Sequence, residues 1–107
     1  MRQVLIVDDD EGFRRIASKL LVGRGYGVIG YADSVAQARL AMKEMRPDAV
    51  LLDINLPDGD GALLAEELAT SHPGLRVLLT SSEATPGCSG FVAKTDLVAT
   101  DLESYLG

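Results

Sequence analysis

The sequence predicts an α/β domain of the doubly wound kind, in which helices cover both faces of a parallel sheet. Short apolar runs alternate along the chain with longer segments of helical hydrophobic spacing, a pattern typical of such sheets. The chain has 107 residues, which is enough for one domain. Its five strand-like runs fit the strand order 2-1-3-4-5.

The first strand and helix are predicted at the start of the chain. Val4–Val7 is a short run rich in β-branched residues. Asp10 is a candidate N-cap for the helix that follows, and Gly23 and Gly25 provide its stop. Apolar residues recur on one face of this helix: Phe13, Ile16, Ala17, Leu20 and Leu21.

The second strand and helix follow the same pattern. Gly27–Tyr31 is a strand diluted by glycine, which favours a position at the sheet edge. Asp33 or Ser34 caps the next helix, which ends before Pro47. Its core residues are spaced as in a helix: Val35, Ala38, Ala41, Met42 and Met45.

The middle of the chain predicts a buried strand and a third helix. Ala49–Leu52 is continuously apolar, as expected for a strand covered on both faces. Asn55–Gly61 contains one proline and two glycines and is predicted to be a loop. A helix from about Asp60 ends at His72–Gly74, and its inward residues are Leu63, Leu64 and Leu68.

The last third of the chain completes the sheet. Val77–Leu79 is the fourth strand and Phe91–Ala93 is the fifth. A final helix is expected from about Thr95 to Leu106.

Composition excludes several classes of function. The 16 acidic and 10 basic residues give a net charge of −6, and the sequence has no basic stripe for binding nucleic acid or a membrane surface. The longest apolar runs are far shorter than the roughly 20 residues that cross a bilayer. The single cysteine, Cys88, cannot form an internal disulfide. We expect a cytoplasmic protein.

Polar side chains follow the predicted strands at one end of the sheet. They are Asp8 and Asp9 after the first strand, Asp53 after the third, Thr80 after the fourth and Lys94 after the fifth. Open α/β sheets bind ligands at this end. Three neighbouring carboxylates repel one another, and Mg²⁺ relieves the conflict. A carboxylate beside such a metal, with a hydroxyl and an ammonium opposite, is suited to phosphoryl transfer.

These motifs together resemble the receiver domain of two-component response regulators, a family with the CheY-like fold. The resemblance covers the whole chain, residues 1–107, as a single receiver domain. The matching stretches occur in the family's order: Val4–Asp9, Leu51–Gly61, Leu78–Thr80 and Gly90–Lys94. One such motif alone is weak, but four in register make the match specific.

The resemblance implies a role for each matching residue. Asp53 would be the phospho-acceptor and would bind Mg²⁺ together with Asp9. Asp8 would act on the metal through water, and Asn55 would contribute its backbone carbonyl.

It further implies that Thr80 hydrogen-bonds the phosphoryl group and that Lys94 pairs with it. Phe91 would be the switch aromatic that turns inward when Thr80 moves. The implied partners are a sensor histidine kinase or phosphotransfer protein and a downstream output protein or domain. The only chemistry implied is the domain's own phosphorylation and dephosphorylation.

The sequence departs from the family pattern at two places. Thr95 follows Lys94, where many receivers have proline. Only the ten residues Ser81–Gly90 separate Thr80 from Phe91, and this segment lacks an apolar face. Ten extended residues span at most about 33 Å, too little to return along the sheet and also hold a packed helix. The fourth helix is therefore predicted to be absent or reduced to a turn.

Loss of that helix predicts an uncovered apolar surface on the fourth and fifth strands, where Leu78 and Val92 would project. We expect this surface to be covered by a second copy, a partner or another part of the chain. The final helix could also tilt over the gap and fill it.

Other interpretations explain parts of the pattern. A pseudo-receiver would keep the fold and bind partners without being phosphorylated. A dehalogenase-type phosphatase would need a second acid where this chain has Asn55. A flavin-binding protein would hold the flavin phosphate at the loop after the first strand, where Asp8–Glu11 would repel it. His72 and Cys88 are assigned no chemistry.

Overall fold

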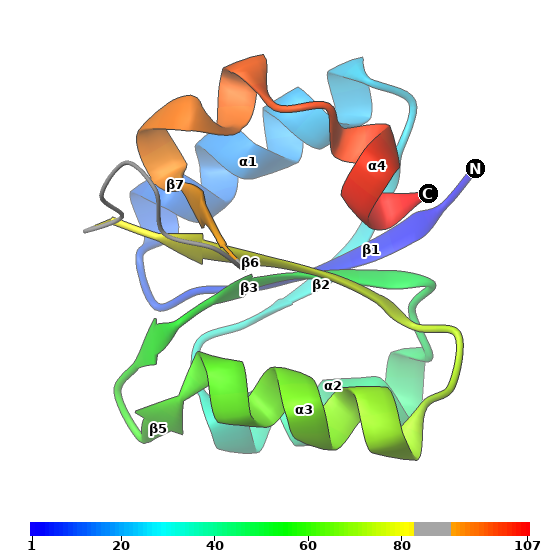
Figure 1. The fold of residues 1–107 in the computed structure, drawn as a ribbon, viewed down its shortest axis with the longest axis vertical. Helices are drawn as coiled ribbons and strands as arrows, with labels where there is room; N and C mark the ends of the chain where they lie inside the picture. The colour runs from blue at the N-terminus through cyan, green and yellow to red at the C-terminus, as the bar shows by residue number, and fades with distance from the viewer. Residues whose placement is uncertain (83–90) are drawn as a thin grey trace.

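The computed structural model describes residues 1–82 and 91–107, and they form the predicted doubly wound architecture (Figure 1). Parallel strands lie in the order β2-β1-β3-β6-β7, which is the predicted order 2-1-3-4-5 counted along this sheet. β2 is at the sheet edge, as its glycines indicate. The strands are β1 (Gln3–Val7), β2 (Gly27–Ala32), β3 (Ala49–Asp53), β6 (Arg76–Ser81) and β7 (Val92–Ala93).

Helices cover both faces of this sheet (Figure 1). One face packs against α1 (Glu11–Gly23), the 3₁₀ helix η1 (Lys94–Ala99) and α4 (Leu102–Leu106). The other packs against α2 (Val35–Met45) and α3 (Gly61–Ser71). β1 and β3 send alternate side chains into the two core clusters, which explains why both strands are continuously apolar.

Short polar side chains cap the helices, as the sequence indicates. The Asp10 carboxylate accepts hydrogen bonds from the first-turn amides of α1. Ser34, one of the two candidates, caps α2. Asp60 caps α3, which ends before His72 as predicted.

The prediction of one continuous final helix is wrong. Instead η1 and α4 are separated by two extended residues, Thr100 and Asp101. In a continuous α-helix, five residues would turn Leu102 about 140° away from Leu97. The break allows both side chains to enter the core, where each is 2% exposed.

Three apolar residues expected in the core are instead exposed: Ile16, Leu63 and Met45, at 66%, 64% and 38%. Ile16 and Leu63 each come one residue before a buried position. One residue turns the side chain about 100° around the helix axis, so both point away from the sheet. The predicted loop after β3 also contains a small hairpin, β4 (Asn55–Leu56) and β5 (Gly59–Asp60).

The prediction of a reduced fourth helix concerns a segment that lies largely in residues 83–90, outside the described residues. The expected exposure of Leu78 is wrong, because this residue is 1% exposed and packs in the cluster of Leu97, Leu102 and Leu106. Val92 packs against the same cluster. η1 and α4 therefore cover the surface that was expected to be exposed around Leu78 and Val92. The formation of a homodimer stays a prediction. Among the described helices, none is long and apolar enough to cross a membrane.

Candidate functional site

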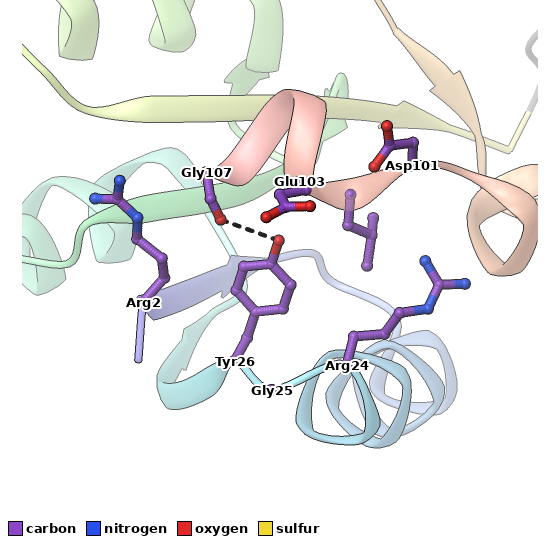
Figure 2. Close-up of a pocket in the computed structure, with 8 residues that line it drawn as sticks. Arg2, Arg24, Gly25, Tyr26, Asp101, Glu103 and Gly107 are labelled. Atoms are coloured by element: carbon purple, nitrogen blue, oxygen red, sulfur yellow. Dashed lines mark hydrogen bonds between the residues drawn. The ribbon is translucent and has the colours of Figure 1, made fainter.

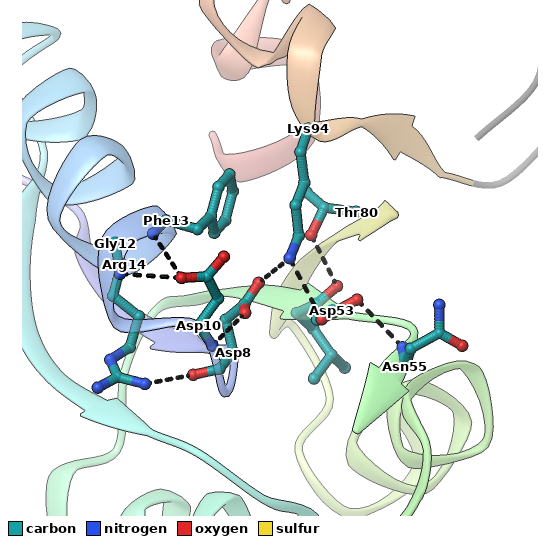
Figure 3. Close-up of polar contacts among 10 residues, drawn as sticks. Asp8, Asp10, Gly12, Phe13, Arg14, Asp53, Asn55, Thr80 and Lys94 are labelled. Carbon is teal, nitrogen blue, oxygen red and sulfur yellow. Dashed lines mark hydrogen bonds and ion pairs between the residues drawn. The ribbon is translucent and has the colours of Figure 1, made fainter. Parts of the chain in front are cut away.

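Three carboxylates meet at the carboxyl end of the sheet (Figure 3 shows two of them). Asp8 and Asp9 follow β1, and Asp53 is the last residue of β3, the neighbouring strand. One carboxylate oxygen from each lies within 4.8 Å of the others. Asp8 and Asp53 are buried, whereas Asp9 is exposed. The strand order thus brings together the acids that the sequence singled out.

Lys94 reaches this acid cluster from the opposite side of the pocket (Figure 3). Its Nζ atom lies 2.7 Å from Asp8 Oδ2 and 3.3 Å from Asp53 Oδ2. Its side chain is only 14% exposed, so these ion pairs are largely shielded from water. One ammonium contacts two buried carboxylates, and with Asp9 the cluster keeps an excess of negative charge.

The electrostatics of the cluster reflect burial as well as charge. Burial raises the pKa of the Asp8 carboxyl, and the nearby Asp53 charge adds to this, although the ion pair with Lys94 opposes it. Burial alone would lower the pKa of the Lys94 ammonium, but its ion pairs with Asp8 and Asp53 outweigh this and raise it. The ammonium therefore stays protonated, and the buried acids favour an added cation.

The backbone around Asp8 is held in place from α1. Asp8 Oδ1 accepts a hydrogen bond from the Asp10 amide at 2.9 Å. The Arg14 guanidinium donates to the Asp8 carbonyl oxygen at 2.7 Å (Figure 3). The cap at Asp10 then fixes the first turn of the helix against the same loop. These contacts give the carboxylate of Asp8 one orientation.

Asp53 is held by its own loop and by α3. Its Oδ1 atom accepts from the Asn55 amide at 3.1 Å. The first residue of α3, Gly61, lies so close that a Cβ atom there would be 2.0 Å from the Asp53 carbonyl oxygen. Only glycine allows this approach, in which the Gly61 amide donates to the Ile54 carbonyl. The α3 start is thereby packed directly on the backbone that carries Asp53.

Thr80 and Phe91, the two predicted switch residues, have different surroundings. Thr80 pairs with Asp53 across β3 and β6, is fully buried, and has its hydroxyl 3.5 Å from the Leu52 carbonyl oxygen. Phe91 is half-buried and lines a neighbouring hollow, which also includes Asn55. Thr80 thus lies next to the acid cluster, whereas Phe91 lines a separate hollow beside it.

The acid cluster opens into a hollow of about 780 Å³, bordered by Asp9, Asp53, Asn55 and Lys94. Sequence reasoning missed one of its walls, Phe13, whose ring lies 4.5 Å from Lys94 Nζ. Phe13 was assigned only to the core-facing side of α1. Its position three residues after the cap Asp10, in the first turn of α1, was the available signal.

The donor set fits a small, hard divalent cation. Asp8, Asp9 and Asp53 offer carboxylate oxygens close enough to share one ion. Mg²⁺ prefers oxygen ligands and accepts one or two carboxylates while keeping waters. The open hollow leaves room for those waters and for a phosphate-bearing group.

Comparisons with known proteins agree with this geometry. The sequence profile described as the response regulator receiver domain matches residues 4–102. The chain is 40% identical over 104 residues to the DNA-binding transcriptional activator DevR/DosR of Mycobacterium tuberculosis, covering 88% of this chain and 48% of that protein. It is 34% identical over 80 residues to the chemotaxis protein CheY of Bacillus subtilis, covering 75% of this chain and 67% of that protein.

Solved structures show the same similarity. The signal receiver domain of NarL from M. tuberculosis has a TM-score of 0.79 at 31% identity, covering 96% of this chain and 94% of that one. The response regulator TrrA of Thermotoga maritima, solved in complex with Mg²⁺-BeF, has a TM-score of 0.72 at 25% identity, covering 78% and 72%. The chain spans about half the length of the first curated relatives it matches.

Proposed function

Because the chain belongs to the response regulator receiver domain family, we propose that Asp53 accepts a phosphoryl group and that residues 1–107 make up one such domain. The donor is the phosphohistidine of a sensor histidine kinase or of a phosphotransfer protein. An oxygen of the Asp53 carboxylate attacks phosphorus, and the bond from phosphorus to the histidine nitrogen breaks. Its electron pair stays on the imidazole.

One observation supports this proposal most strongly: Asp53 ends a central strand inside a cluster of three acids, and the two buried acids of this cluster both contact Lys94. A buried carboxylate that is held in place in this way is well placed to act as the nucleophile. Repulsion from Asp8 and Asp9 makes the site favour added positive charge.

Asp8, Asp9 and Asp53 would hold Mg²⁺, with the Asn55 backbone carbonyl as a further ligand. When bound, the ion would neutralise charge on the phosphoryl oxygens. The solved complex of TrrA with Mg²⁺-BeF supports this assignment.

Lys94 and Thr80 would contact the transferred group. The Lys94 ammonium already points into the cluster and can pair with a phosphoryl oxygen in place of a carboxylate. The Thr80 hydroxyl would leave the Leu52 carbonyl and donate to the phosphoryl group. Phe91 would move with Thr80 and pass the change to the surface.

The signal is read by a downstream protein or by an output domain on the same polypeptide. The relative DevR/DosR is about twice as long as the stretch matched here, which supports the second arrangement. Because cytoplasmic kinase domains are the donors, we place the domain in the cytoplasm. The acidic chain is not itself proposed to bind nucleic acid.

Intact mass measurement after treatment with phosphoramidate and Mg²⁺ tests the proposal. We expect the wild-type protein to gain one phosphoryl group, and Asp53→Asn to gain none. Asp58→Asn is a matched control, because Asp58 is an exposed acid in the loop after Asp53. An unmodified wild-type protein would favour the pseudo-receiver, and equal modification of Asp53→Asn would contradict the assigned acceptor.

A further inference from the structure

The aromatic ring of Phe13 forms a wall of the phosphorylation site that the mechanism above does not use. Lys94 Nζ lies 4.5 Å from the centre of this ring. Figure 3 shows the ring beside the lysine, on the α1 side of the pocket. At this distance the negative face of an aromatic ring attracts an ammonium group.

Phe13 has contacts at both its backbone and its ring. Its amide donates to the Asp10 carboxylate that caps α1, at 3.3 Å. Its ring packs against the core cluster that contains Leu97 and Leu102. A ring packed in this way presents its face to the Lys94 ammonium.

The ammonium of Lys94 therefore has partners of two kinds. Asp8 and Asp53 are charged, and their attraction for Lys94 weakens when a cation or a phosphoryl group shares their charge. The Phe13 ring is neutral, so its attraction does not depend on the state of the carboxylates. The Phe13 ring also shields the Lys94 ammonium from water on one side. This shielding strengthens the ion pairs of Lys94 with Asp8 and Asp53.

We propose that Phe13 is a positioning residue for phosphoryl transfer, holding the Lys94 ammonium at the mouth of the pocket through the face of its ring. This role rests on the proposed function of Asp53 and adds a residue to it. Phe13 contacts neither the acceptor nor the donor; it acts through Lys94.

Two substitutions separate the ring face from simple packing. Phe13→Leu keeps an apolar side chain but removes the aromatic face, whereas Phe13→Tyr keeps the face. Val22→Ala is a matched control on the same helix, since Val22 is apolar, is 59% exposed and does not line the hollow at the acid cluster. Phosphoramidate is the donor, so that docking of a protein partner does not enter the measurement.

We expect Phe13→Leu to lower the maximal phosphorylation rate at saturating phosphoramidate by about three- to tenfold, the size expected for loss of a cation–π contact. Its Mg²⁺ affinity should not change. Phe13→Tyr and Val22→Ala should react at the wild-type rate. In NMR spectra, the Lys94 Cε protons should be shifted upfield by the ring in the wild-type and Tyr proteins, and not in the Leu protein.

A Phe13→Leu protein that reacts as fast as wild type would overturn the role of Phe13 alone. Equal slowing in Phe13→Tyr, or the absence of an upfield shift in the wild-type protein, would also overturn it. If the wild-type protein takes up no phosphoryl group, the assignment of Asp53 fails, and the role of Phe13 fails with it.

Discussion

The two ends of the sheet treat polar groups in opposite ways. At the carboxyl end, the buried carboxylates of Asp8 and Asp53 have Lys94 as a shared counter-charge. At the amino end, polar side chains bond to the backbone: Asp48 accepts from the Gln3 amide at 2.8 Å, and the Tyr26 hydroxyl donates to the Gly107 carbonyl at 3.2 Å (Figure 2).

We infer from this difference that the amino end serves the fold and that the carboxyl end serves function. Bonds between side chain and backbone at the amino end hold the chain ends on the sheet and use no buried charge. At the carboxyl end, like charges are buried together, which works against folding. Residues that break a local rule of stability in this way mark a functional site.

The largest expected effect is the loss of phosphorylation when the acid cluster is broken. Asp9→Ala should abolish Mg²⁺-dependent phosphorylation, because it removes a proposed ligand of the ion. Since Asp9 is exposed, the free energy of unfolding should not fall. Asp33→Ala is the control, as Asp33 is an exposed acid that follows the neighbouring strand β2. Intact mass measurement with and without Mg²⁺ checks both variants.

Removal of the shared counter-charge should be the next largest effect. Lys94→Ala should slow phosphorylation by roughly a hundredfold, the size seen when one donor to a charged transition state is lost. Its Mg²⁺ affinity should be retained, because the lysine contacts the carboxylates and is not a ligand. Phosphoramidate kinetics and a Mg²⁺ titration measure the two quantities, and a collapse of Mg²⁺ affinity would contradict the assignment.

Adding a cation should remove the conflict between the buried acids. We expect Mg²⁺ at tenfold its dissociation constant to raise the free energy of unfolding by about 1.4 kcal/mol. Asp53→Asn should show less of this gain. Urea unfolding with Mg²⁺ or with EDTA provides the measurement, and an equal response of Asp9→Ala and wild type would argue against a shared metal site.

The carboxyl end was also easier to predict from the sequence. Parallel strands all end at one side, so the positions of Asp8, Asp53 and Lys94 follow from counting strands. Helix caps such as Asp10 bond to residues only two or three positions away, so they can also be predicted from the local sequence. The contact of Phe13 with Lys94 joins residues 81 positions apart, and local pattern could not reveal it.

Contacts across long stretches of the chain also account for the other missed features. Asp58 accepts hydrogen bonds from the first amides of α2, 23 and 22 positions away, and these bonds lower the pKa of its carboxyl. The break at Thr100 depends on where Leu97 and Leu102 meet the sheet. Arg24, at the end of α1, donates to the carbonyl oxygens of Val98 and Thr100 beside that break.

Substitution at the amino end should change stability alone. Arg24→Ala should lower the free energy of unfolding by about 1 kcal/mol, because it removes hydrogen bonds that tie η1 to α1. Arg15→Ala on the same helix should cost less than about 0.5 kcal/mol, since its pair with Glu11 is exposed. Both proteins should be phosphorylated at the wild-type rate. A slower reaction of Arg24→Ala would contradict the inference that the amino end of the sheet serves stability alone.

The effect expected at Tyr26 is no larger than that of Arg24→Ala at neutral pH, and it shrinks as the pH rises. Burial raises the pKa of the Tyr26 phenol above its usual value of 10.0, and the charges of Glu103 and Asp101 add to this. The folded state therefore favours the neutral phenol, so its contribution is fully present below the unfolded pKa and is lost as pH rises through the folded one. Tyr26→Phe should cost about 1 kcal/mol at neutral pH through loss of the hydrogen bond to Gly107. Because phenylalanine does not ionise, the difference between the two proteins should shrink above about pH 10. Urea unfolding of both proteins across this range measures it, and a constant difference would mean that the phenol ionises equally in the folded and unfolded chains.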